Sequence, residues 1–213
     1  MFSLIQAAGW PVWFLILTSL LAVALIVERF LSLKRDRILP PRLLDEVLTL
    51  YRARQITPEM IQKLESSSAL GRVFASGLRQ ELAGREVMKE AMEEVGRAVA
   101  HDLEKYVGAL GTIASIAPLM GLFGTVVGMI EIFGAQAPTG TNPQQLAHGI
   151  SVALYNTAFG IAISIPSLIF YRHFKNKVEG FVVQMEQAAA KLVDIAHGER
   201  FDFQKPGASP RQG

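Results

Sequence analysis

Two threonines, Thr125 and Thr157, interrupt long uncharged apolar runs and have the clearest chemical potential in this sequence. A hydroxyl in hydrocarbon needs a hydrogen-bond partner, because an unsatisfied polar group is costly there. It either bonds back to the carbonyl one turn earlier in its own helix, or it faces water, an ion or a polar partner. If the two runs are antiparallel helices, Thr125 lies about 12 Å and Thr157 about 16 Å below the outer surface, at roughly 1.5 Å per residue. We therefore expect both hydroxyls at a similar depth near the bilayer centre.

Small or polar residues accompany both threonines at helical spacing. Beside Thr125 and Thr157 these are Gly121, Gly124, Gly128, Ala153, Asn156, Gly160 and Ser164. Small residues on one face let helix backbones approach closely. The pattern predicts either a tight helix contact or a narrow polar pathway, and both alternatives stay open at this stage.

Three uncharged runs, 10–27, 107–130 and 146–171, are long enough to cross the roughly 30 Å hydrocarbon core of a bilayer. The first does not resemble a cleaved signal peptide, because no Lys or Arg precedes it and no small-residue cleavage pattern follows. The sequence therefore predicts an all-α membrane protein with three transmembrane helices, of which spans two and three extend into a cytoplasmic helical bundle.

The basic residues set the expected topology. All 21 Lys and Arg residues lie in 28–106 or after 171, and such residues stay on the cytoplasmic side. We expect these segments: a first transmembrane helix in 1–33 with its N-terminus outside, a cytoplasmic helical region in 34–106, the second span in 107–133, a periplasmic loop in 134–145, the third span in 146–172, a cytoplasmic helix in 173–200 and a disordered tail in 201–213. The basic residues would then meet anionic lipids, and no nucleic-acid partner is expected.

The sequence contains no recognisable catalytic motif. There is no cysteine, the four histidines lack metal-ligand spacing, and no HExxH, GxSxG, Walker or GxGxxG pattern occurs. We expect a protein that is not an enzyme and holds neither a cofactor nor a metal.

Helical signals also occur outside the spans. Thr57 and Pro58 are typical of a helix start. Helices are expected over 42–54, from 57, over 68–82 and, without a break, over about 85–133, and Asn142 and Pro143 are expected to start the last one. One apolar stripe consists of Val87, Met88, Ala91, Val95, Ala98, Val99 and Leu103, and a heptad seam consists of Phe174, Val178, Phe181, Met185, Ala188, Leu192 and Ile195. The seam requires a partner helix, either 85–106 of the same chain or another subunit.

Two stretches together carry a family resemblance. "LMGLFGTVVGMIEIF" and "GISVALYNTAFGIAISIPSLIFY", with "VERFLSLKR" at 27–35, resemble the signature of the MotA/TolQ/ExbB proton-channel family, and the three spans are similar to ExbB and TolQ rather than to MotA. The resemblance implies a bacterial inner-membrane subunit that forms a homopentamer around an ExbD-like single-span partner with a membrane aspartate. It implies that ion flow drives rotation and that a TonB-like protein receives the work.

The resemblance also implies roles for residues. The family's two pore threonines correspond to Thr125 and Thr157, and the neighbouring Ser164, Gly121, Gly128, Ala153, Gly160 and Asn156 are expected to line the ion pathway. Val152 stands where ExbB and TolQ often have a glutamate, so titration is expected to rest on the partner's aspartate, with proton or sodium as the coupling ion. Glu131 is an added acid, either an ion-entry or partner contact or a solvated interfacial group. The alternatives to an ExbB-like motor are a TolQ-like subunit in envelope integrity and a passive membrane scaffold.

Overall fold

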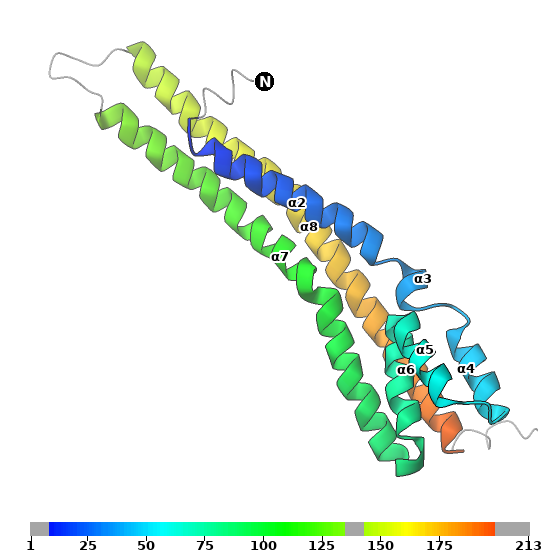
Figure 1. The fold of residues 1–213 in the computed structure, drawn as a ribbon. Coiled ribbons are helices and arrows are strands. Elements are labelled where there is room, and N and C mark those ends of the chain that lie inside the picture. The colour runs from blue at the N-terminus through cyan, green and yellow to red at the C-terminus, as the bar shows by residue number, and fades with distance from the viewer. Residues whose placement is uncertain (1–8, 135–142, 199–213) are drawn as a thin grey trace, which may run out of the picture. The chain divides into compact units, whose positions relative to one another are not determined.

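The computed structural model describes residues 9–134 and 143–198, and within them every regular element is a helix. In chain order these are α2 (Val12–Ser32), α3 (Arg35–Ile38), α4 (Leu43–Arg52), α5 (Pro58–Ser67), α6 (Ala69–Arg79), the 3₁₀ helix η1 (Glu81–Ala83), α7 (Arg85–Gly134) and α8 (Pro143–Ala196) (Figure 1). The predicted all-α class is confirmed, and so are the long helix from residue 85 and the helix start at Thr57 and Pro58. The single helix predicted over 68–82 is instead α6, which ends at Arg79, followed by η1. The expected cap Asn142 and the tail 201–213 lie outside the described residues.

Three helices are long and apolar enough to cross a membrane: α2, α7 and α8. In each of these helices, at most 28% of the apolar 18-residue segment is buried within the chain. Large side chains such as Trp13, Leu20 and Leu154 are more than 60% exposed. Because soluble proteins do not leave so much apolar surface uncovered, lipid or other chains must cover these faces. The prediction of three spans is confirmed by length and composition.

The contacts divide the chain into two compact units, and α7 and α8 contribute to both. The first unit comprises Met1–Ser32 and Glu104–Asn176 and therefore holds α2 with the apolar parts of α7 and α8. The second unit comprises Leu33–Leu103 and Lys177–Gly213 and holds the short helices with the remaining parts of α7 and α8. Within the first unit α2 lies along the other two spans (Figure 1).

One charged residue of α2 is buried. Arg29 is only 4% exposed. Its Nε donates to the Glu28 carboxylate at 2.5 Å, and its guanidinium lies 4.9 Å from the ring centroid of Tyr106 on α7. A carboxylate and an aromatic face together compensate a cation that has lost its water. This contact therefore ties one end of α2 to α7.

The second unit contains a helical hairpin, α5 and α6, whose ends are capped by side chains. The Thr57 hydroxyl accepts from the Met60 amide at 3.3 Å, and the Ser68 hydroxyl accepts from the Gly71 amide at 3.0 Å. Both caps satisfy amides that have no partner inside the helix.

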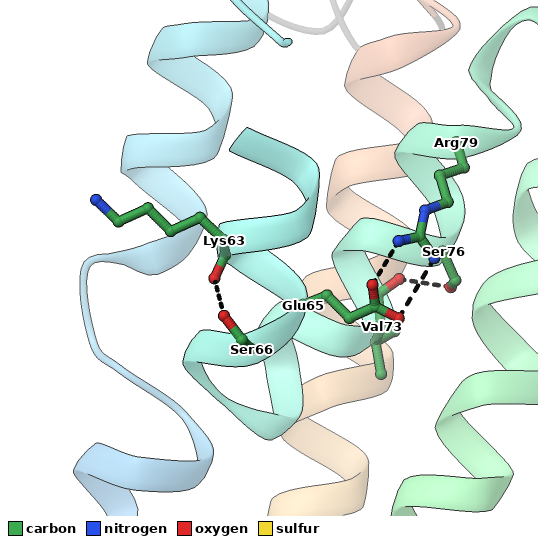
Figure 2. A network of polar contacts seen from close by, with 6 residues as sticks. All are labelled: Lys63, Glu65, Ser66, Val73, Ser76 and Arg79. Carbon is green, nitrogen blue, oxygen red and sulfur yellow. Dashed lines mark hydrogen bonds and ion pairs between the residues drawn. The ribbon is translucent and has the colours of Figure 1, made fainter. Parts of the chain in front are cut away.

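Further polar contacts join α6 to α5 and to α7. The Ser76 hydroxyl donates to carbonyls in both α6 and α7, those of Val73 at 2.8 Å and Ala91 at 3.2 Å. The Arg79 guanidinium donates to both oxygens of Glu65, which joins α6 to α5 (Figure 2). The hydrogen bond from Arg79 lowers the pKa of the Glu65 carboxyl.

The buried stripe of α7 in the second unit differs from the predicted one. Met88 and Val99 are buried as expected, but Val87 is 42% exposed and Met92, which the prediction left out, is 2% exposed. The stripe is therefore rotated by part of a turn, because α6 approaches through Gly77, where an added Cβ would lie 2.5 Å from the Met92 sulfur. Ala98 is exposed for the same reason.

Most of the predicted seam of α8 is buried within the chain. Five of its seven positions, Phe174, Val178, Phe181, Met185 and Leu192, are each at most 4% exposed, and Ala188 and Ile195 are half-buried. The alternative of intrachain packing is thus sufficient for these residues. Between α7 and α8 of the second unit a cavity of about 580 Å³ remains, lined in part by Gly96, Ala100, Ala189 and Ala190.

Tyr51 of α4 closes the second unit near the end of α8. Its hydroxyl donates to the Glu81 carboxylate at 2.6 Å and lies 3.3 Å from the Ala196 carbonyl oxygen. Burial, and next the hydrogen bond to Glu81 and the charge of Glu81, raise the pKa of Tyr51 to about 12. The folded state therefore holds this proton more tightly than the unfolded chain, in which a tyrosine has a pKa of about 10.

This raised pKa predicts a loss of stability at high pH. Stability contributed by neutral Tyr51 is complete below about pH 10 and is lost as the pH rises toward 12, because the unfolded chain releases the proton first. The difference in phenolate absorbance between the wild type and Tyr51→Phe, followed from pH 8 to 13, should show a midpoint near 12. A midpoint near the ordinary value of about 10 would contradict the contact with Glu81.

The start of α6 predicts a steric defect. A Cβ at Gly71 would lie 2.2 Å from the Leu64 carbonyl oxygen, which is backbone and does not yield easily. Gly71→Ala should therefore lower the thermal midpoint in detergent, with an overpacking cost of about 1–3 kcal/mol. Gly96→Ala is the matched control, since an added Cβ there meets nothing within 4 Å and alanine is the better helix former. Equal midpoints for the two variants would refute the close crossing of α5 and α6.

Candidate functional site: the contact between the second and third spans

The small residues of α7 and α8 in the first unit bring the two backbones into contact. A Cβ added at Gly121 would lie 2.7 Å from the Asn156 carbonyl oxygen and 3.1 Å from the Thr157 Cα. A Cβ added at Gly160 would lie 2.6 Å from the Ala117 carbonyl oxygen. Only glycine permits such an approach at these two positions. Of the two alternatives predicted from the small residues, the tight helix contact is present within a single chain.

The remaining small residues extend the same contact along both helices. Gly124 lies against the Asn156 side chain. Gly128 lies beside Ala153, and a Cβ added at Gly128 would lie 3.7 Å from the Ala153 Cβ. Asn156 is fully buried, and its Nδ2 donates to the Val152 carbonyl at 3.3 Å. The contact explains these small residues by packing, and their expected part in lining an ion pathway stays a prediction.

Ser164 also belongs to this contact. Its hydroxyl donates across the helices to the Ala114 carbonyl oxygen at 2.5 Å. Its proton is therefore committed to the backbone of α7. The small-residue pattern indicated that Ser164 faces α7 or a pathway, but it did not identify this acceptor.

The contacts set the register of the two threonines. Thr157 lies beside Gly121, and Thr125 is four residues further along α7, so the two hydroxyls are offset by about one turn, roughly 6 Å. The expected depths, about 12 and 16 Å, differ by somewhat less. Thr125 donates to the Leu122 carbonyl at 2.6 Å, which is the back-bonded geometry of membrane threonines. Its hydroxyl oxygen keeps the capacity to accept a hydrogen bond.

The side on which α2 packs follows from residues just before the contact positions. Met120 precedes Gly121, and its sulfur lies 3.6 Å from the Thr18 hydroxyl of α2. The ring of Phe123, which precedes Gly124, lies 6.3 Å from that of Trp10. On α8, Tyr171 packs on Gly111 of α7. Phe170 directly precedes Tyr171, and the Phe170 ring lies 5.5 Å from the ring of Phe30 in α2. These neighbours therefore place α2 on one flank of the contact.

The threonines occupy the opposite flank. Thr125 directly follows Gly124, and Thr157 directly follows Asn156, both of which lie in the contact. One residue step turns a helix by about 100°, so a residue after a contact position and a residue before it lie on opposite sides. Because the helices are antiparallel, this rule puts both threonines on the same side of the pair. Both are half-buried, and α2 leaves their flank uncovered.

Two further residues of interest lie apart from this flank. Glu131 is exposed near the end of α7 and takes no part in the glycine contact. Val152, at the expected glutamate position, precedes the contact residue Ala153 and lies near Gly9, on the α2 side. Within 9–134 and 143–198, no group of three His, Cys, Asp or Glu side chains could hold a metal ion.

Comparisons with known proteins agree with the pattern of the spans. The profile of the MotA/TolQ/ExbB proton channel family matches residues 65–187. The chain is 33% identical over 163 residues to the putative biopolymer transport protein ExbB-like 3 of Synechocystis, covering 74% of this chain and 77% of that protein. It is 31% identical to the biopolymer transport protein exbB1 of Vibrio cholerae, over 76% of this chain and 74% of the relative. It is also 31% identical to the Tol-Pal system protein TolQ of Haemophilus influenzae, over 54% and 52% of the respective chains.

The backbone contact at Gly160 predicts a sharp difference between two glycines of the spans. Gly160→Ala forces a Cβ to within 2.6 Å of a carbonyl oxygen, whereas an added Cβ at Gly108 meets nothing within 4 Å. We expect Gly160→Ala to lower the thermal midpoint in detergent, at a cost of about 1–3 kcal/mol. Gly108→Ala should leave the midpoint unchanged or raise it slightly. A Gly160→Ala protein as stable as Gly108→Ala would show that α7 and α8 do not touch at this point.

Proposed function

The chain belongs to the MotA/TolQ/ExbB proton channel family, and from this premise we propose that it is the ring-forming subunit of an ExbB-like ion-driven motor. The family consists of channel and motor subunits rather than enzymes, and this chain is a multi-pass membrane protein of that family. In the proposed motor, ion flow does work that serves transport across the outer membrane. The names of the Synechocystis and Vibrio relatives, both biopolymer transport proteins, support this assignment.

One observation carries the proposal: Thr125 and Thr157 share the flank of the α7 and α8 pair that α2 leaves uncovered. A hydroxyl on a free flank can exchange hydrogen bonds with water or with a carboxylate. In a ring of copies, this flank would face the axis, while the exposed apolar surface of α2 would face lipid. The two hydroxyls, about one turn apart, would form successive contacts along the ion path.

The partner at the axis would supply the titrating group. Val152 provides no carboxylate in the third span, and an intramembrane charge is usually functional where it occurs. We propose a homopentamer around an ExbD-like single-span protein whose membrane aspartate carries the proton, or takes part in sodium binding. The half-buried Thr125 and Thr157 would contact this carboxylate, and a TonB-like protein would receive the work. Glu131, exposed at the end of α7, would act in ion entry or partner contact.

The orientation in the membrane follows from the charges. With basic residues confined to 28–106 and the part after 171, the second unit would lie in the cytoplasm of a bacterium and 134–145 in the periplasm. Lys and Arg near the inner ends of the spans would contact anionic lipids. The chain would then be an inner-membrane protein.

A second candidate is a TolQ-like subunit of an envelope-integrity motor. The match to TolQ of Haemophilus influenzae supports it, although that match covers a smaller share of both chains than the matches to the Synechocystis and Vibrio relatives do. A passive scaffold is a third candidate, because the glycine contact would be needed in any hairpin of this kind. The three candidates differ in whether the hydroxyls matter and in which cellular process fails without them.

The motor proposal predicts the effect of removing one hydroxyl. Thr157→Val keeps the shape of the side chain and removes its hydrogen bonding, so the ring should assemble while uptake that depends on the proton motive force falls at least about tenfold, as expected for the loss of roughly 1.4 kcal/mol or more along the path. Uptake would be measured in cells that co-express the single-span partner. Thr125→Val should behave in the same way.

Thr112→Val is the matched control. Its hydroxyl also bonds back within α7, to the Gly108 carbonyl at 3.2 Å, and the side chain is exposed. Thr112 lies roughly 20 Å along the helix from Thr125, at about 1.5 Å per residue, and therefore at another depth than the two threonines of the site. Uptake by Thr112→Val should stay normal. Normal uptake by Thr157→Val and Thr125→Val would favour the scaffold, whereas a defect in envelope integrity with intact uptake would favour the TolQ-like role.

A further inference from the structure

Pro118 lies inside α7 and leaves one carbonyl without its usual donor. A proline has no amide hydrogen, so the carbonyl four residues earlier, that of Ala114, receives no hydrogen bond from the helix. Ala114 is 5% exposed. In a span, an unsatisfied carbonyl is costly and is tolerated where another group supplies a donor.

Ser164 supplies that donor from the neighbouring helix. Its hydroxyl lies 2.5 Å from the Ala114 carbonyl oxygen. Serines elsewhere on α8 bond back within their own helix: Ser151 to the Ala147 carbonyl at 2.9 Å and Ser167 to the Ile163 carbonyl at 2.7 Å. Back-bonding is the ordinary choice for a helical serine. Ser164 thus donates to the Ala114 carbonyl, which is the carbonyl that lacks a helical donor because of Pro118.

We propose that Ser164 is a positioning residue, whose hydroxyl replaces the amide that Pro118 lacks and so holds α7 against α8 at the turn where Pro118 removes a helical hydrogen bond. The next turn of α7 carries Gly121, which touches the backbone of Thr157. The hydrogen bond and the glycine contact are therefore adjacent, and together they set where Thr125 lies relative to Thr157. The consequence for transport rests on the proposed function, whereas the bond itself does not.

The bond is tested by a double-mutant cycle on stability, with the full chain purified in detergent. Ser164→Ala should lower the thermal midpoint in the Pro118 background. In the Pro118→Ala background it should have almost no effect, because the new amide at 118 then donates to Ala114. Ser167→Ala is the matched control, since the Ile163 carbonyl keeps its own helical donor; it should have equal, small effects in both backgrounds. Equal losses from Ser164→Ala in both backgrounds would overturn the proposal.

A second pair of variants keeps the test valid if Pro118→Ala does not assemble. Ser164→Thr retains the hydroxyl and should keep most of the wild-type midpoint. Ser164→Val has nearly the same shape as the threonine variant but lacks the hydroxyl, so it should lower the midpoint as Ser164→Ala does. Indistinguishable midpoints for the threonine and valine variants would overturn the proposed bond.

The positioning role is tested by measuring energy-dependent uptake. In assembled complexes, Ser164→Ala should lower energy-dependent uptake by about three- to tenfold, the range in which loss of one interhelical hydrogen bond shifts a two-state equilibrium, and Ser164→Thr should rescue it. Normal uptake by Ser164→Ala, together with a positive stability cycle, would overturn the positioning role. Failure of the motor proposal itself would show differently, as normal uptake by Thr157→Val with the Ser164 and Pro118 coupling intact.

Discussion

The approach of two helix backbones at Gly121 and Gly160 is the constraint on which the site depends. An added Cβ at either glycine would lie within 2.7 Å of a carbonyl oxygen of the other helix. Between apolar spans there is little hydrophobic gain from association, since lipid is as apolar as the helices, so close packing and interhelical hydrogen bonds must hold the pair together. The contact also determines which residues flank it. Thr125 and Thr157 reach the same open side because each follows a contact residue directly.

The polar groups of the spans have two different uses in this arrangement. Asn156 and Ser164 are directed into the α7 and α8 contact, where each hydrogen-bonds to a backbone carbonyl. Thr125 and Thr157 lie at its edge and are half-buried. Polar residues at similar depth in one hairpin therefore do not act as a single cluster. Asn156 and Ser164 stabilise the contact between the helices, and the threonine pair would remain accessible to a partner in the proposed motor.

The second unit is built from ordinary capping and packing. Thr57 and Ser68 cap their helices, Arg79 joins α6 to α5 through Glu65, and Gly71 allows the hairpin to close. Five of the seven seam residues of α8 are buried within the chain, so these five do not depend on another subunit for cover. The second unit therefore has a buried core of its own, to which parts of α7 and α8 contribute.

Much of this architecture is determined by the sequence alone. The lengths of the apolar runs determine the three spans, because the thickness of a bilayer sets the length of a crossing helix. Thr57 with Pro58 and the unbroken stretch from residue 85 determine helix boundaries, because capping and the absence of breakers are local properties. The paired motifs of the second and third spans identify the family, and their small residues indicate that a close helix contact exists.

Only the tertiary structure decides which residues share a side. Residues 120 and 125 fall on opposite flanks of one helix, and which flank is free depends on where α2 packs, a choice that no local pattern in α7 or α8 encodes. The predicted stripe of α7 is wrong at Val87 and lacks Met92, because the orientation of the stripe is set by the approach of α6 at Gly77. The link between Pro118 and Ser164 likewise joins residues 46 positions apart in the sequence, and it becomes visible only when the register of two antiparallel helices is known.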